Sequence, residues 1–220
     1  MNKPILFDTK NVKALIDRKK TVTRRVIKIK HSDVYKMACV YGKWSETYAD
    51  EVPDELIAWY AKEKAKPMYS VGDMLWVRET WAKNADFADK SLSVPDGFIY
   101  KASGEYHMGM KWRPSIFMPR EAARIFLRVT DVRVERLQEI TEEESIKEGS
   151  VKSVLFVTSH IAEEMARLND AFGTFINGFQ LIWESTVKKE DYFKNGWNAN
   201  PYVWVYEFEI CEKPEGWCEP

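Results

Sequence analysis

Apolar and polar residues alternate along two long stretches of the chain, which is the pattern of half-buried β-strands. In the first stretch Ile125, Leu127 and Val129 share one face, and the alternation shifts near Asp131. Such a shift predicts a β-bulge at that position. In the second stretch, over residues 202–210, aromatic residues alternate with Val and Glu. Both stretches are therefore predicted to form long strands.

Shorter strands are predicted where β-branched or alternating apolar residues lie beside turn signals. They cover residues 5–7, 21–23, 75–81 and 97–101, the third of them after the Gly72-Asp73 turn. Residues 40–44 are interpreted as a turn between two further short strands.

Helical spacing appears first before residue 17, where Val12, Leu15 and Ile16 recur on one helix face. A polar residue between positions 8 and 11 is expected to cap this helix. Further helices are predicted over residues 54–66, 161–168 and 174–187. The apolar stripe of the last helix is more typical of a core than of a ligand site.

One short helix carries a carboxylate in an unfavourable place. Thr141 and Glu144 form a capping-box pattern, which predicts a helix that begins there and stops at Gly149. Glu148 falls in its last turn, where the negative end of the helix dipole disfavours a carboxylate. Helix stability does not explain Glu148, so this residue is a candidate for a functional role.

Strands with helices at their edges predict an α+β fold, a small mixed β-barrel with flanking helices. We expect one domain over residues 1–220, with inserted segments near 31–68, 82–113 and 151–190. The first inserted segment is expected to cover the site, and a loop as long as the second is often functional.

Composition narrows the class of protein. The 220 residues are 45% hydrophobic with a net charge of -1, so a core can form and a polyanion site must be a local basic patch. Three cysteines without metal-ligand spacing favour a reducing, cytoplasmic setting. We expect no signal peptide and no membrane span. The three histidines also lack metal-ligand spacing, and we expect no metal and no cofactor.

Five cations and two threonines crowd into residues 17–25. Because alternate residues of a strand share a face, Thr21, Thr23 and Arg25 are expected to point together, with Lys20 at the entrance of the strand. A lysine amine, a threonine hydroxyl and an arginine then converge on one small volume. The alternative is that the cations only complement the helix dipole and are solvated, as most charge runs are.

Two further stretches combine aromatic rings with charges. Trp76 and Arg78 lie on one face of the strand over 75–81, and Glu79 lies on the other face. Arg78 and Glu79 either bind a ligand or make cross-strand charge pairs. Trp112 stands between two cations. It either stacks on a base beside a phosphate or packs beneath solvated side chains.

In their order and joint presence these stretches resemble the ASCH family of PUA-like proteins. The resemblance is carried by residues 18–25 and 71–77, by the strand and helix that end at 148–149, and by the last strand, 203–208. A larger pattern is similar to phage and prophage ASCH-like proteins of about this length, and it includes residues 75–81, 112–120 and 197–204. The resemblance implies a PUA-like mixed β-barrel.

The small bacterial ASCH amidohydrolases deacylate N4-acetylcytidine with a lysine, a threonine three residues later and a glutamate on a later helix. The matching positions are Lys20 as proton acceptor, Thr23 as nucleophile and Glu148 as proton donor. The resemblance thus implies a hydrolase acting on an amide-like bond of a modified nucleoside or base. The residues expected to bind the substrate are Arg24, Arg25, Trp76, Arg78, Glu79 and Trp112.

The chain departs from those enzymes, which are about half its length, and the inserted segments would build a lid or an oligonucleotide groove. Other ASCH proteins are described as RNA-binding modules or as ribonucleases. Two alternatives therefore stay open. One is a non-catalytic RNA- or DNA-binding module whose Lys and Arg cluster holds phosphate, and the other is a metal-dependent ribonuclease. The predicted partner is a modified nucleoside or nucleic acid, and the sequence does not specify an oligomeric state.

Overall fold

The computed structural model describes residues 2–42, 52–83, 97–104, 111–155, 168, 170 and 173–217. Most of the helix predicted over 161–168 lies outside these residues, as do His107, His160 and Cys218. Parts of the three predicted insertions also lie outside them.

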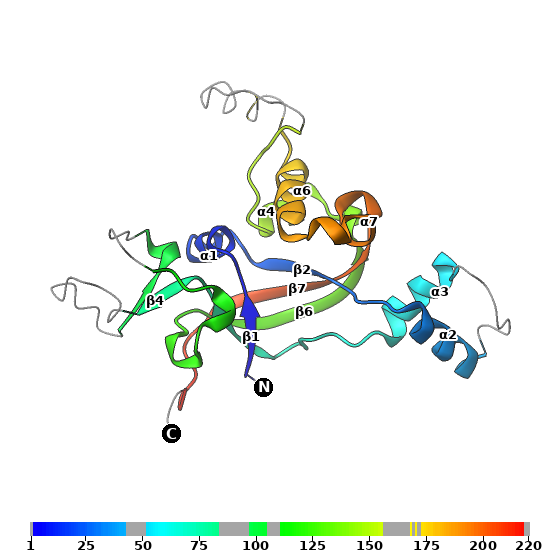
Figure 1. Ribbon diagram of the computed structural model, residues 1–220, viewed down its shortest axis with the longest axis horizontal. Coiled ribbons are helices and arrows are strands. Elements are labelled where there is room, and N and C mark those ends of the chain that lie inside the picture. The colour runs from blue at the N-terminus through cyan, green and yellow to red at the C-terminus, as the bar shows by residue number, and fades with distance from the viewer. Residues whose placement is uncertain are drawn as a thin grey trace.

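A five-stranded mixed sheet forms the centre of the molecule, with the strand order β1-β3-β6-β7-β2 (Figure 1). Its strands are β1 (Asn2–Leu6), β2 (Val22–Val26), β3 (Met74–Arg78), β6 (Phe126–Arg136) and β7 (Tyr202–Cys211). β1 runs parallel to β3, and the other neighbours are antiparallel. A separate two-stranded ribbon pairs β4 (Trp81–Lys83) with β5 (Phe98–Tyr100). The predicted α+β class with a mixed sheet is confirmed.

The bulge predicted in β6 is present. The register between β6 and β7 shifts between Val129 and Asp131. One extra residue there moves the following side chains relative to the partner strand and adds twist. The charged residues Arg133 and Glu135 thereby share one face of the strand with Asp131, and this face contributes to the site described below.

The sheet does not close into the predicted barrel. β1 and β2 are its two edges, and no hydrogen-bonded ladder joins them in the part of the chain that the structure describes. Instead, the Arg25 guanidinium donates to the Leu6 carbonyl at 2.9 Å. Tyr69 donates to the Pro4 carbonyl at 2.8 Å and packs edge to face on Tyr206. Side chains therefore occupy the gap that strand pairing would close, and the prediction of a closed barrel is wrong.

Helices cover the sheet on one side and extend it at one end (Figure 1). The α-helices are α1 (Thr9–Ile16), α2 (His31–Val40), α3 (Asp54–Trp59), α4 (Glu142–Lys147), α6 (Phe175–Thr186) and α7 (Tyr192–Asn195). A π-helical turn, Tyr60–Lys64, continues α3. Short 3-10 turns cover Lys101–Ser103, Ser115–Phe117, Arg120–Ala122, Leu137–Glu139, Lys189–Asp191 and Trp197–Ala199. No described helix is long and apolar enough to cross a membrane.

Most of the predicted local signals are found in these elements. Asp8 caps α1 by accepting from the Asn11 backbone, and Thr141 with Glu144 forms the capping box of α4. The turn predicted within residues 40–44 is present at Tyr41 and Gly42. The short strand predicted before it is wrong, because residues 31–40 form α2, and the strand predicted after it lies outside the described residues. Val34 and Ala38 of α2 are buried on one face, and this helical spacing of four residues is too weak a signal in a sequence of mixed polarity.

β7 separates two hydrophobic clusters because its side chains alternate between the faces of the sheet. On one face Val203 and Val205 pack with Phe179 of α6. On the other face Tyr206 and Phe208 belong to the cluster that includes α1. β2 lies beside β7 at the edge of the sheet, so its side chains also divide between these two environments.

Candidate functional site

Lys20 enters the site through a tight turn at the end of α1. Arg18 adopts a left-handed conformation with φ 57°, and the Lys20 amide donates to the Ala14 carbonyl at 3.0 Å. Positive φ is strained for a residue with a side chain, so this turn redirects the chain in a conformation that is locally destabilising. The chain then enters β2 with Lys20 directed inward and buried.

Glu148 reaches Lys20 because α4 ends beside the edge of β2. The Thr21 amide donates to the Lys147 carbonyl at 2.8 Å, and Lys20 and Glu148 form an isolated antiparallel bridge. Gly149 then turns with φ 81°, and a Cβ at this position would stand 2.7 Å from the Ala14 Cβ. Only glycine lets α4 end this close to α1. The turn thereby unites two residues 128 positions apart.

Lys20 and Glu148 form a buried ion pair. The Lys20 Nζ lies 2.6 Å from the Glu148 Oε2 and donates to the Glu148 carbonyl at 2.9 Å. The two side chains are 2% and 4% exposed. Burial lowers the pKa of the Lys20 ammonium below its usual value, although the charge and hydrogen bond of Glu148 oppose that shift. Lys20 therefore loses its proton more readily than an exposed lysine does.

Arg24 holds three carboxylates from the other face of β2. Its side chain is fully buried and lies 3.3 Å from Glu148, 3.0 Å from Glu135 and 2.7 Å from Glu144. Its Nε is buried without a hydrogen-bond partner among the described atoms. Arg133 extends the network, since it bonds Glu135 and Glu144 as well. The Glu148 carboxylate is thus held between Lys20 and Arg24.

The cations also act on the neighbouring acid in this network. Burial tends to raise the pKa of Glu144, but the charges of Arg24 and Arg133 and a backbone hydrogen bond from Thr141 outweigh it, so the pKa stays below its usual value. Glu144 is therefore held as a carboxylate and completes the pairing of Arg24. Arg24 is thereby fixed in position beside Glu148.

Thr23 lies on the same side of β2 as Arg25, which follows it by two residues. Lys20 and Arg25 both approach the Phe7 ring, at 5.7 and 5.3 Å, so the two cations lie on the same side of the sheet. Thr23 is buried, and its hydroxyl makes no hydrogen bond to the described residues. Lys20, Arg25 and Glu148 thus lie close enough to act on one another electrostatically, and the convergence of the Thr23 hydroxyl with them stays a prediction.

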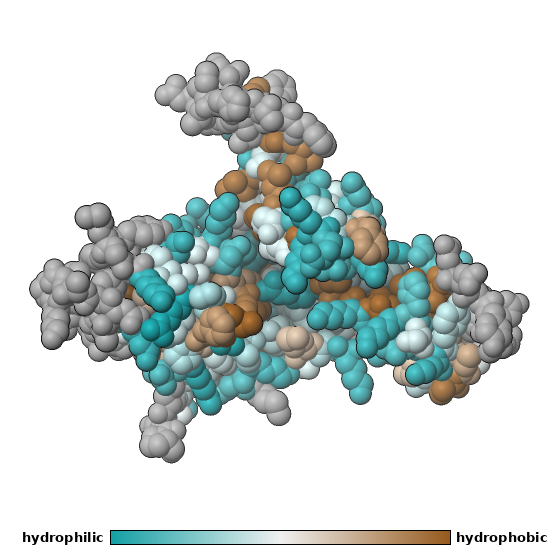
Figure 2. Space-filling model, in the orientation of Figure 1, coloured by the Kyte–Doolittle hydropathy of each residue, from teal (hydrophilic) through white to brown (hydrophobic). Residues whose placement is uncertain are grey.

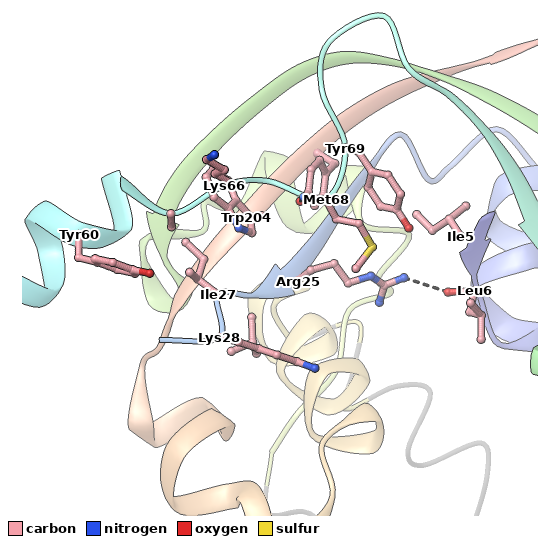
Figure 3. Close-up of a pocket in the computed structure, with 13 residues that line it drawn as sticks. Ile5, Leu6, Arg25, Ile27, Lys28, Tyr60, Lys66, Met68, Tyr69 and Trp204 are labelled. Carbon is pink, nitrogen blue, oxygen red and sulfur yellow. Dashed lines mark hydrogen bonds between the residues drawn. The ribbon is translucent and has the colours of Figure 1, made fainter. Parts of the chain in front are cut away.

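An open cleft of about 580 Å³ lies in the gap between the two edge strands. Arg25 crosses this gap toward Leu6, beside Met68 and Tyr69 (Figure 3). The wall comes from both edges, from β7 and from the segment before β3: Ile5, Leu6, Arg25, Val26, Ile27, Lys28, Tyr60, Ala65, Lys66, Met68, Tyr69, Trp204 and Tyr206. This volume is within the usual range for small-molecule sites. Of the predicted site residues, Arg25 alone lines this cleft.

Burial shifts the pKa of three groups on this wall. It lowers the pKa of Arg25, and it raises the pKa of the Tyr69 and Tyr206 hydroxyls, partly offset by the nearby Arg25 charge. Both phenols therefore stay protonated near neutral pH and can act as hydrogen-bond donors.

Trp76, Arg78 and Glu79 are predicted site residues that lie elsewhere, near the β4–β5 ribbon. Trp76 packs edge to face on Trp217, and Arg78 donates to the Ile116 carbonyl while its guanidinium lies 5.4 Å from the Trp76 ring. Glu79 is buried against Arg124. None of the three side chains lines the cleft or contacts Lys20.

Trp112 is half-buried next to Arg113, whose backbone bridges to Trp81 of β4. Its position is therefore at the same ribbon and outside the lining of the cleft. The second aromatic and cationic stretch of the sequence thus forms a group of its own.

The sequence interpretation missed Glu135 and Arg133 and most of the aromatic wall of the cleft. The row of charges at 131, 133 and 135 on one face of β6 was a visible signal, because a long central strand rarely carries three charges in register without partners. Trp204 gave no such signal, since it falls in an alternating pattern typical of core residues, and Tyr69 falls in a segment without regular periodicity.

In the described part of the chain, no group of His, Cys, Asp and Glu is arranged to hold a metal ion. The carboxylates of Glu135, Glu144 and Glu148 instead converge on Arg24. This grouping is an ion-pair network, with cations supplied by the chain itself.

Comparisons with known proteins give little more. No family model matches the chain, and no curated protein matches it. Among solved structures, the chain is similar to one described as an ASCH domain from Lactobacillus crispatus JV V101, at 12% identity over 95% of this chain and 79% of that chain. The TM-score is 0.33, which is too low to support an argument on fold or function. Membership of the ASCH family therefore stays a prediction from the sequence motifs.

Proposed function

We propose that this protein is an ASCH-type hydrolase that cleaves an amide-like bond of a modified nucleobase of the N4-acylcytidine type. The observation that carries the proposal is the buried ion pair between Glu148 and Lys20, which lies three residues before the buried Thr23 in the chain. A lysine becomes a base only where burial or neighbouring cations lower its pKa, and both conditions hold at Lys20.

The hydrogen bond between Lys20 and Glu148 supplies the acid and the base together. Transfer of one proton along this 2.6 Å bond turns the ammonium and carboxylate into an amine and a carboxylic acid. The amine takes the Thr23 hydroxyl proton as the oxygen attacks the acyl carbon. The carbon–nitrogen bond then breaks, and the Glu148 acid protonates the departing amino group. Water next hydrolyses the ester on Thr23, releasing a carboxylic acid and regenerating the hydroxyl.

Arg25 connects this chemistry to the cleft, because it shares a strand face with Thr23 and also lines the cleft wall. A planar base would stack on Trp204, the partly exposed ring of the three that line the wall with Tyr69 and Tyr206, which are buried. For the acyl group to reach Thr23, the Arg25 side chain must leave the Leu6 carbonyl. Ligand binding would replace that hydrogen bond by one to the acyl or base oxygen.

The test is turnover of a panel of N-acylated nucleosides by the wild type and by Glu148→Gln. We expect Glu148→Gln to lower turnover by about 10²–10⁴-fold, the usual span for a positioned acid or base, and to leave nucleoside affinity largely intact. The matched control is Glu143→Gln, which removes one carboxylate from an exposed position of the same helix. Retained turnover in Glu148→Gln, or no turnover of any substrate by the wild type, would contradict the hydrolase.

A second candidate is a non-catalytic module that binds a base in the cleft. The observation that favours it is the location of the cleft, which Lys20, Thr23 and Glu148 do not line. In this case affinity would depend on Arg25 and the aromatic wall, and Glu148→Gln would leave affinity unchanged while no turnover is seen. Lys20 is not suited to hold a phosphate, because its ammonium is buried and already paired.

A further inference from the structure

Arg24 and Arg25 are neighbours in β2, but they differ in their partners. Arg24 pairs with three carboxylates on one face of the strand. Arg25 points to the other face, and it forms no ion pair with the residues that the structure describes. Its guanidinium donates instead to the Leu6 carbonyl, a neutral acceptor, at 2.9 Å. A guanidinium has several N–H donors, so most of those of Arg25 are left for a ligand.

Two carboxylates act on Arg25 through space, and both already have partners. They belong to Glu148 and Asp8. Glu148 is held by two buried cations, and Asp8 caps α1 by accepting from a backbone amide. Neither forms an ion pair with Arg25. Arg25 therefore places a positive charge without a direct counterion at the wall of the cleft between the two edge strands.

Tyr206 brings a second donor to the same cleft. In the pairing of β2 with β7, Tyr206 lies opposite Thr23, and directly opposite side chains share a face of the sheet. Tyr206 lines the cleft and is 1% exposed. Its hydroxyl oxygen accepts from the Met68 amide at 3.2 Å, whereas its proton has no acceptor among the described residues. A buried tyrosine hydroxyl usually finds such a partner, so this donor is open to a ligand.

The rest of the wall is apolar or cationic. Lys28 and Lys66 line the cleft, are exposed and form no ion pair with the described residues, so they attract anions toward it. No described carboxylate is part of the lining. In Figure 2, hydrophobic residues appear between the sheet and the α2–α3 region, with hydrophilic residues on both sides of them. An anion with an apolar body suits such a wall.

The donors favour a carboxylate over a phosphate. A guanidinium forms two parallel hydrogen bonds with a planar carboxylate, and the single charge of Arg25 balances a single negative charge. A phosphate monoester carries about −1.5 to −2 charges at pH 7, and burying the excess beside apolar residues is costly. A carboxylate also accepts more strongly than the Leu6 carbonyl and can replace it. Leu6 is 40% exposed, so water can then satisfy its carbonyl.

We propose that the cleft between the two edge strands binds a carboxylate on an apolar body, with the Arg25 guanidinium and the Tyr206 hydroxyl as its donors. Under the proposed function, this carboxylate is the far end of the acyl group, which is then a monoamide of a dicarboxylic acid. Residues two positions apart on a strand are about 6.6 Å apart, so a short diacid can reach from Thr23 to Arg25. That identity rests on the proposed function, whereas the binding of a carboxylate does not.

The first test is the affinity of three compounds with one apolar body, measured by isothermal titration calorimetry. They are 4-phenylbutyrate, 4-phenylbutyramide and 3-phenylpropyl phosphate. We expect the carboxylate to bind at least about tenfold more tightly than the amide, because a hydrogen bond to a charged group is the stronger one. The carboxylate should also bind more tightly than the phosphate ester, whose excess charge has no partner in the cleft.

Two variants remove one donor each. Arg25→Met should weaken 4-phenylbutyrate binding at least about tenfold and abolish the preference over the amide. Tyr206→Phe keeps the ring and removes the hydroxyl, so it should weaken binding by about three- to tenfold without disturbing the core. The matched controls are Arg128→Met, an exposed arginine, and Tyr202→Phe, both outside the lining of the cleft. Neither control should change the affinity.

The second test compares turnover of N4-succinylcytidine and N4-butanoylcytidine, whose acyl chains have equal length and differ in the terminal carboxylate. We expect at least about tenfold higher kcat/KM for the succinyl compound, carried by KM. Arg25→Met should remove this difference. Equal kcat/KM for the two compounds would overturn the assignment of the carboxylate to the acyl group.

Three results of the calorimetry would overturn carboxylate binding itself: an amide or a phosphate ester that binds as tightly as the carboxylate, an unchanged preference in Arg25→Met, or an equal loss in the controls. Turnover of either acylated cytidine in such a case would leave the hydrolase standing without this site. Carboxylate binding that depends on Arg25, without turnover of any acylated nucleoside, would instead retain the site and exclude the hydrolase.

Discussion

Glu148 and Glu79 are both buried carboxylates, yet their surroundings differ. Glu79 receives two hydrogen bonds from one guanidinium, at 2.8 and 3.0 Å from Arg124, and the Arg124 side chain is 31% exposed. Glu148 is shared between Lys20 and Arg24, whose side chains are 2% and 0% exposed. Glu79 is thus paired with one partly solvated guanidinium, whereas Glu148 is paired with two buried cations.

A buried charge alone therefore does not mark a functional site. A guanidinium that satisfies both oxygens of a carboxylate fixes geometry and keeps its proton at any ordinary pH. Burial raises the pKa of Glu79, and the Arg124 hydrogen bond only partly offsets it, but Arg124, the partner of this carboxylate among the described residues, cannot exchange a proton with it. Lys20 can lose its proton, so the pair at Glu148 has chemistry available that the pair at Glu79 lacks.

Substitutions of Lys20 and of Arg124 should differ most in their effect on turnover. Lys20→Met should lower hydrolysis of an acylated nucleoside by about 10²–10⁴-fold, because the variant removes the base that accepts the Thr23 proton. Arg124→Met should leave turnover unchanged, since Arg124 is an anchor of Glu79 far from the chemistry. Steady-state kinetics of both variants on one substrate would measure this. Equal losses of turnover in both variants would show that the different surroundings of Glu148 and Glu79 do not matter for function.

The next effect concerns stability, measured by urea denaturation. Glu148→Ala should lower the free energy of unfolding by roughly 3–5 kcal/mol, because it leaves a buried ammonium without its partner. Glu79→Ala should cost less, about 1–3 kcal/mol, since Arg124 can turn to water.

A double substitution sharpens this test. Lys20→Met with Glu148→Leu should bring stability back to within about 1 kcal/mol of the wild type, because apolar residues often replace a buried ion pair without loss. Arg24 would keep Glu135 and Glu144 in that variant. A double variant as unstable as Glu148→Ala alone would show that the pair is required for folding, which would weaken the assignment to catalysis.

Local signals in the sequence predicted much of the fold. The bulge at Asp131, the capping box at Thr141 and the strand after Gly72 each have a sequence signal within a few residues, and all are present. Closure of the sheet was not predictable in this way. It depends on whether β1 meets β2, and the Tyr69 side chain that lies between them belongs to a segment without regular periodicity.

The same distinction between local signals and tertiary packing applies to the candidate site. Lys20, Thr23 and Glu148 are predicted site residues because they match motifs, and Glu148 also because it opposes a helix dipole. Trp76 and Arg78 were grouped with them because they share a neighbouring strand, but they face the cluster around Trp217. Which face of a strand meets which cavity is decided by tertiary packing, and residue alternation alone leaves it open.

A smaller effect tests how Glu148 is placed. Gly149→Ala should lower the free energy of unfolding by roughly 2–4 kcal/mol, the sum of a strained positive φ and a Cβ 2.7 Å from Ala14. Gly72→Ala is the matched control. It has φ 85° but no described atom within 4 Å, so it should cost only about 1–2 kcal/mol. Turnover should fall in the first variant and not in the second, if the Gly149 turn aligns Glu148 with Lys20.

The smallest expected effect is a pH dependence, and it examines Lys20 directly. The pKa of the Lys20 ammonium in the folded chain lies below the ordinary value of 10.5, chiefly because of burial. Between these two values the unfolded chain binds more protons than the folded chain, so the free energy of unfolding must rise with pH across that interval. The slope from one group is at most about 1.4 kcal/mol per pH unit.

Urea denaturation of the wild type and of Lys20→Met at a series of pH values would isolate the contribution of Lys20, because the variant lacks the titrating amine. The stability of the wild type relative to Lys20→Met should increase with pH up to about 10.5, whereas Arg124→Met should keep the slope of the wild type. A relative stability that stays flat or falls with pH would mean that Glu148 keeps Lys20 fully charged. Lys20 would then resemble Arg124, and the distinction between the two buried carboxylates would be lost.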